Sequence, residues 1–164
     1  MKRLSLSLLA AALLFAVPAF AREQAPVEES TTATSGKPSV EKALTDWKDA
    51  VEHGKVDEIM KMYDPKAIVI STFAQEPLTK REEIKGYFKK IAVNTDIQVN
   101  IQDSYSRVFE SMAVINGRYT LSYVQEGETI SIPARFSFVY VLKGGKWMII
   151  TQHSSRVPLP DKDE

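Results

Sequence analysis

Side chains that could perform acid, base, nucleophilic or metal chemistry are few in this chain of 164 residues. There is no cysteine, which excludes a thiolate nucleophile, a disulfide and a cysteine-ligated metal. The two histidines, His53 and His153, lie far apart in the sequence and do not have the spacing of a metal-binding motif. We therefore expect no metal ion. The sequence also has no dinucleotide or flavin fingerprint, so we expect no cofactor.

His153 lies near the end of the last strand-like segment, in the sequence Gln-His-Ser-Ser, where an imidazole suits proton transfer or hydrogen bonding to a ligand. Ser154 and Ser155 are adjacent on this strand and point to opposite faces, and no carboxylate is placed to orient the ring. The pattern favours a histidine that ties the strand to the C-terminal segment over a catalytic one. His53 precedes Gly54 and is expected at the C-terminal end of a helix.

Arg118 is the most informative charged residue, because it lies inside an apolar strand pattern. Strand alternation places Arg118 and Thr120 on one face, and Tyr119 and Tyr123 on the other. A few polar groups within an otherwise apolar strand are typical of a cavity wall, and the alternative is a position at a solvated sheet edge.

Two helices are expected at the start of the folded part. Ser39 is a plausible N-cap for a helix whose apolar positions recur as far as Val51 and which ends at Gly54. A second, shorter helix is expected over residues 56–63. It ends at Asp64-Pro65, where Asp64 is interpreted as a turn residue.

The remaining pattern predicts a short strand, a third helix and then a sheet. Residues 67–72 form a β-branched run, and Thr79 with Glu82 matches a capping box that opens the third helix. Alternation then predicts four long antiparallel strands over 97–108, 112–124, 129–142 and 147–155. This order is typical of an α+β fold in which helices cover one face of a curved sheet.

The first residues have the pattern of a secretory signal. Lys2 and Arg3 precede an apolar run from Leu4 to Val17, and Ala19-Phe20-Ala21 offers the small-x-small pattern that a signal peptidase recognises. We expect a signal peptide over residues 1–21, in preference to an uncleaved anchor, and a periplasmic or secreted protein.

The rest of the chain divides into three segments. Residues 22–38 are rich in Ser, Thr, Glu, Pro and Ala and are expected to form a flexible linker. Residues 39–158 are expected to form one domain, and residues 159–164 a disordered tail. Without residues 1–21 the chain has 19 basic and 21 acidic residues, so we expect no nucleic-acid partner and no membrane partner after cleavage.

Three stretches of the sequence resemble nuclear transport factor 2-like proteins. The segment PARFSFVYVLKGGKWMIITQHSSRVP resembles their closing hairpin, GRYTLSYV their middle strand, and VEHGKVDEIMKMYDPKA the helices before their first strand. The resemblance is closest to the association domain of calcium/calmodulin-dependent protein kinase II and to bacterial relatives that carry the SgcJ/EcaC label. It spans roughly residues 40–158. It implies a cone made of a curved antiparallel sheet and three N-terminal helices, a fold that hosts many functions.

The resemblance also implies where a ligand would bind. In the kinase association domain, arginines in the pocket bind small carboxylates, and Arg118 matches one of these positions. Phe138 and Ser154 stand at the other two arginine positions, which weakens the positive charge of the site. Arg135 lies nearby with the opposite strand parity to Phe138. The predicted ligand-binding residues are Arg118, Thr120, Phe138, His153 and Arg135.

Three functions remain open. The first is an exported module that holds a small polar or anionic organic molecule in the cone, or that assembles as a homodimer or higher homo-oligomer. Its dimer surface would be the outer sheet face, if that face shows Tyr119, Tyr123 or Tyr140. The second is a cofactor-free isomerase or dehydratase in which His153 or a carboxylate moves a proton. An accessory protein that reaches an envelope component through its linker is a third possibility. The oxidoreductase label of the bacterial relatives has no support in these residues.

Overall fold

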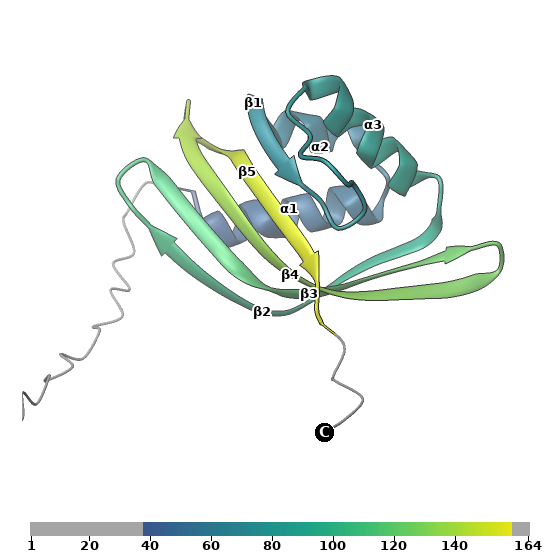
Figure 1. The fold of residues 1–164 in the computed structure, drawn as a ribbon. Helices are drawn as coiled ribbons and strands as arrows, with labels where there is room; N and C mark the ends of the chain where they lie inside the picture. Colours follow the sequence, from purple (N-terminus) through teal and green to yellow (C-terminus); the bar gives the residue numbers. More distant parts are fainter. Residues whose placement is uncertain (1–37, 159–164) are drawn as a thin grey trace, which may run out of the picture. The chain divides into compact units, whose positions relative to one another are not determined.

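The computed structural model describes residues 38–158, which form three helices and one five-stranded sheet. The elements follow the chain as α1 (Val40–Glu52), α2 (Val56–Met62), β1 (Tyr63–Ile70), α3 (Arg81–Ala92), β2 (Thr95–Val108), β3 (Met112–Gln125), β4 (Glu128–Lys143) and β5 (Lys146–Arg156). The strand order is β1-β5-β4-β3-β2. Figure 1 shows the three helices together on the concave side of the sheet. The α+β architecture with three helices is confirmed.

Three local predictions are wrong: the turn at Asp64-Pro65, a sheet made only of antiparallel strands, and the position of the capping box of the third helix. The strand β1 begins at Tyr63, so Asp64 and Pro65 lie in a strand, and this edge strand tolerates a proline, which has no N–H to donate. It also runs parallel to β5, which makes the sheet mixed. The third helix has Lys80 as its N-cap, and Glu83 accepts the backbone N–H groups of Thr79 and Lys80. This is one residue later than the predicted capping box. The predicted signal peptide, most of the linker and the tail lie outside the described residues.

Hydrogen bonds between side chains and backbone groups stabilise the ends of the first two helices. The Ser39 hydroxyl accepts the N–H of Lys42 at 3.2 Å, as the sequence predicted for an N-cap. At the other end of α1, Glu52 accepts the N–H of Val99 at 2.7 Å, which ties α1 to the edge strand β2. Arg81 donates to the carbonyl of Met60 at 2.8 Å and so caps the end of α2. None of the helices within residues 38–158 is long and apolar enough to cross a membrane.

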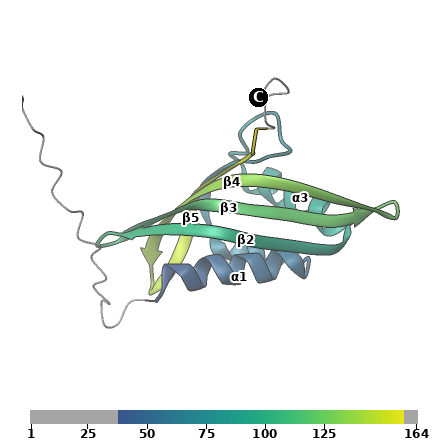
Figure 2. The same ribbon diagram turned by 90° about the horizontal axis from the view of Figure 1, so that it is seen from below.

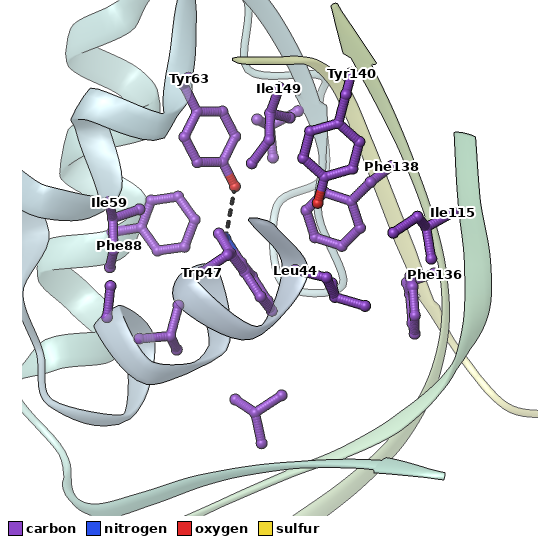
Figure 3. Close-up of a cluster of buried hydrophobic side chains, with 14 of the residues drawn as sticks. Leu44, Trp47, Ile59, Tyr63, Phe88, Ile115, Phe136, Phe138, Tyr140 and Ile149 are labelled. Atoms are coloured by element: carbon purple, nitrogen blue, oxygen red, sulfur yellow. Dashed lines mark hydrogen bonds between the residues drawn. The ribbon is translucent and has the colours of Figure 1, made fainter. Parts of the chain in front are cut away.

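Aromatic side chains fill the space between α1 and the sheet. Trp47 lies with its ring centroid 5.0 Å from that of Phe138, in an edge-on arrangement. Its indole N–H donates to the hydroxyl of Tyr63 at 3.0 Å (Figure 3), and that hydroxyl donates to the buried amide of Gln152. Since these side chains are buried, the middle of the cone is packed with protein.

The curvature of the sheet depends on close contact between β2 and β3. The pairing of these strands shifts register between Ile101 and Asp103, which is a β-bulge. A Cβ atom at Gly117 in β3 would lie 2.1 Å from the carbonyl oxygen of Asp103 and 2.9 Å from the ring of Phe136. Only glycine fits at this approach. Figure 2 shows β2, β3 and β4 running side by side over α1.

We expect Gly117→Ala to destabilise the fold by about 1–3 kcal/mol or more, because the methyl group must displace the backbone of β2. The measurement is urea unfolding followed by tryptophan fluorescence, with exposed Asn116→Ala in the same strand as the control. Equal unfolding midpoints for Gly117→Ala and the wild type would contradict this explanation of the bend.

Asp64 gives the fold an acid-sensitive contact. It is almost buried and pairs with Lys143. The ammonium of Lys143 and the backbone N–H of Lys66 lower the pKa of the Asp64 carboxyl below its ordinary value of 3.8. A lowered carboxyl pKa adds stability above the unfolded-state value, and this stability is lost as the pH falls through the folded-state value.

We therefore expect Lys143→Met to lower the free energy of unfolding by up to about 1 kcal/mol at neutral pH. The effect should be smaller below the pKa of Asp64, where the carboxyl is protonated in both the wild type and the variant. Urea unfolding across the acid range measures the difference, with exposed Lys146→Met as the control. A loss of stability that is the same at neutral and acidic pH would show that this ion pair is not the cause.

Candidate functional site

The five residues predicted to bind a ligand lie on two different faces of the sheet. Arg118, Thr120, Arg135 and His153 are on the outer face, turned away from the helices, where none of them is buried. Phe138 is on the inner face, is fully buried and packs against Trp47. The alternation predicted for β3 is confirmed, since Arg118 and Tyr119 face opposite ways and only the tyrosine is buried.

Arg118 is occupied by a carboxylate of its own chain. Asp103 accepts the backbone N–H of Arg118 at 2.9 Å and its Nε–H at 2.8 Å, and also pairs with Nη2. This hydrogen bonding lowers the pKa of the Asp103 carboxyl and raises the pKa of the Arg118 guanidinium. The Arg118 side chain is 61% exposed. The guanidinium of Arg118 therefore forms a cross-strand ion pair that holds β3 to β2.

The other outer-face residues form rows across the strands. Arg135 lies directly opposite Arg118 and reaches the hydroxyl of Ser155 at 3.5 Å. His153 lies one row further along, between Ile70 and Ser137. Thr120 accepts a hydrogen bond from Gln102 at 2.7 Å. A ligand role for these residues stays a prediction. None of them lines the hollow described next.

A hollow of about 560 Å³ opens at a different place, between α3, the segment before it and the end of β3. Its walls are mainly apolar. They are formed by Phe73, Leu78, Tyr87, Ile91, Val93 and Tyr123. Phe73 and Val93 are 40% and 79% exposed, so apolar surface continues out to the mouth. An apolar cleft with a few polar groups is the usual form of a small-molecule site. We call it the α3 pocket.

Gly86 lies in the wall of the α3 pocket, in the middle of α3. A glycine inside a helix costs about 0.5–1 kcal/mol relative to alanine. A Cβ atom at Gly86 would meet nothing within 4 Å, so no neighbour in the protein requires glycine here. The missing side chain leaves room in the pocket.

The polar groups at the rim differ in whether they are already engaged. Glu83 accepts two backbone N–H groups at the start of α3, which lower the pKa of its carboxyl, and pairs with the ammonium of Lys80 at 3.3 Å. The Asn94 amide donates to the carbonyl of Ile91 at 3.0 Å. Lys90, by contrast, has no carboxylate within ion-pair distance among residues 38–158. Its ammonium is available to a ligand.

Tyrosine hydroxyls in the pocket wall and in the core are neutral hydrogen-bonding groups. Tyr87 lies in the wall of the pocket. Tyr119 is buried in the core. Burial raises the pKa of both tyrosines above the ordinary value of 10.0. Both tyrosines are therefore protonated at neutral pH and are suited to hydrogen bonding. A general base must be deprotonated at the working pH, so neither tyrosine suits that role.

The pocket was missed from the sequence. Strand alternation placed Tyr123 on the face opposite to that of Arg118, but neither it nor the predicted third helix showed that a hollow lay between them. The available signal was Gly86, an isolated glycine within an amphipathic helical pattern. Among residues 38–158, no three His, Cys, Asp or Glu side chains gather as metal ligands.

Comparison with known proteins agrees with the fold and extends over most of the chain. Residues 40–160 match the model of the SnoaL-like domain. A candidate calcium/calmodulin dependent protein kinase II association domain from Xanthomonas campestris is 31% identical, with a TM-score of 0.66, over 71% of this chain and 85% of that one. A search of curated proteins gave no match.

More distant structures share the fold. A candidate dehydratase of the NTF2-like family from Streptomyces avermitilis is 17% identical, with a TM-score of 0.67, over 73% of this chain and 95% of that one. An NTF2-like superfamily protein from Salmonella enterica is 13% identical, with a TM-score of 0.66, over 75% and 92%. The resemblance inferred from the three sequence stretches is confirmed. The chain belongs to the SnoaL-like family, within the nuclear transport factor 2-like superfamily.

Proposed function

We propose that this protein is an exported binding module that holds a small, mainly apolar organic molecule in the α3 pocket. Export rests on the signal pattern of residues 1–21, which would place the domain in the periplasm or outside the cell. Binding rests on the hollow of about 560 Å³ between α3 and the end of β3. A hollow of this size suits a molecule of a few rings.

The main support for this proposal is the absence of a side chain at Gly86, in the middle of α3. Alanine would fit at this helix position and would stabilise α3, yet the position carries no side chain and faces the hollow. The helix is less stable with glycine, and the clearest gain is pocket volume. A ligand that packs against the bare backbone of α3 accounts for both facts.

An acid/base enzyme has less support from the same geometry. Glu83 is the only carboxylate in the described lining of the pocket, and backbone N–H groups lower its pKa. A general base near neutral pH needs the opposite shift. His153, the other candidate, lies on the outer face of the sheet. A binding role therefore requires fewer assumptions than an isomerase or dehydratase.

The Gly86 position supplies a direct test. We expect Gly86→Ala to raise the free energy of unfolding by about 0.5–1 kcal/mol, because it improves helix propensity where there is space. We expect Gly86→Leu to fold but to weaken ligand binding at least about tenfold, because its side chain occupies the pocket. A thermal-shift screen of ring-bearing and aliphatic small molecules, followed by calorimetric titration of the hits, measures both effects.

Arg118→Ala is the matched control for the site. It removes the predicted ligand residue on the outer face and leaves the α3 pocket intact, so we expect it to bind the hits like the wild type. Hits that bind Gly86→Leu normally and fail to bind Arg118→Ala would move the site to the outer face. That result would overturn the proposal.

The outer face also favours a role in assembly. Tyr119 and Tyr140, which were considered as a dimer surface, are buried on the inner face, and Tyr123 faces the same side. The outer face instead shows aliphatic rows next to its polar rows. One row has Ile68, Val139 and Val114, with the polar Thr151 between Ile68 and Val139, and the next row has Met112, Val141 and Met148. Ile68 and Met112 are each 42% exposed. A partly exposed aliphatic surface on a sheet suits contact with a second copy of the chain.

We expect the wild type to form a homodimer and Ile68→Lys to shift it toward the monomer, because an ammonium would then lie in the aliphatic surface. Sedimentation velocity at several protein concentrations measures the change. Thr129→Lys, at the exposed end of β4, is the control and should leave the dimer unchanged. A monomeric wild type at high concentration would refute the assembly role.

A further inference from the structure

The α3 pocket contains two unused features that together indicate a ligand class. One is the ammonium of Lys90, which lies at the rim without a carboxylate partner among the described residues. The other is a set of aromatic rings in the pocket lining, two of which make no contact with another aromatic ring among the described residues. We propose that the ligand is a ring-bearing organic monoanion, with its ring system inside the pocket and its anionic group beside Lys90. This inference rests on the proposed binding function.

The positive charge of Lys90 lies beside the pocket because of the spacing of α3. Lys90 follows Gly86 by four residues, so it lies on the same helix face, next to the space that the glycine leaves. The only carboxylate of the described lining, Glu83, is held by the start of α3 and by Lys80. The remaining polar residues of the lining, Asn94 and Gln125, are neutral. One uncompensated positive charge at the mouth favours a ligand with one negative charge.

Three aromatic side chains line the pocket. Phe73 and Tyr123 have no contact with another aromatic ring within residues 38–158, and Tyr87 has only an edge contact with Phe88. The core behaves differently, because Trp47, Phe136 and Phe138 contact each other or Tyr119. Rings that line a hollow without stacking partners are suited to stack on a flat ligand.

The mouth of the pocket also allows a ligand to place its ring system inside while its anionic group contacts the Lys90 ammonium at the rim. Apolar side chains continue outward from the pocket to the exposed Val93, three residues beyond Lys90. A molecule whose body is buried among the rings would keep its charged end near solvent at the rim. Such a position avoids the cost of burying an unpaired charge.

Three probes with closely similar carbon frameworks separate these features. 2-Naphthoate carries the ring and the charge, 2-naphthamide carries the ring alone, and decahydro-2-naphthoate carries the charge on a saturated framework. Their dissociation constants for the full chain are measured by calorimetric titration at low ionic strength. We expect 2-naphthoate to bind about fivefold more tightly than either of the other probes.

Lys90→Met keeps most of the apolar stem of the side chain and removes its charge, so the preference for 2-naphthoate over 2-naphthamide should fall to near unity. Lys89→Met removes a charge from the adjacent exposed position outside the pocket lining and should leave the preference unchanged. Added salt should weaken naphthoate binding to the wild type and have little effect in Lys90→Met.

The outcomes distinguish this inference from the function on which it rests. If 2-naphthoate and 2-naphthamide bind equally and Gly86→Leu weakens both, the pocket binds ligands but the anionic class is wrong. If decahydro-2-naphthoate binds as tightly as 2-naphthoate, the aromatic part is wrong. If none of the three probes binds at millimolar concentration, the ligand class is overturned. If Gly86→Leu binds them like the wild type, the proposed function is overturned as well.

Discussion

The packing of Trp47 against the inner face of the sheet determines which part of this domain is filled with side chains and which part is left open as a pocket. Its indole contacts Phe138 and donates a hydrogen bond to Tyr63, which in turn bonds Gln152. These buried groups occupy the middle of the cone, so a ligand there would have to displace them. The α3 pocket lies elsewhere, where α3 contributes a glycine instead of a side chain.

Much of the fold could be predicted because its elements have strong periodicity. Alternating side chains identified the four long strands, and helical spacing identified the apolar face of α1. The strand β1 was less readable, since Asp64-Pro65 has the chemistry of a turn, whereas in the fold Pro65 lies in an edge strand and Asp64 pairs with Lys143. That pairing joins residues 79 positions apart, which local sequence does not reveal.

The candidate site was harder to predict than the fold. Alternation correctly separated Arg118 from Tyr119, but it does not say which face meets the helices, and tyrosine suits either environment. The partner of Arg118 was also hidden. Asp103 reaches it only because the bulge in β2 shifts the register of the two strands. A pocket made from α3 and the end of β3 depends on tertiary packing, for which Gly86 was the only local sign.

The claim that the α3 pocket is the ligand site is tested most directly by mapping amide chemical shifts during titration with 2-naphthoate. We expect the largest chemical-shift changes at the amides of Gly86 in α3 and Tyr123 at the end of β3. The amide shifts of Arg118 and Arg135 should change little. Large shifts at Arg118 and Arg135 without shifts at Gly86 would contradict this claim, because they would place the ligand on the opposite face of the sheet.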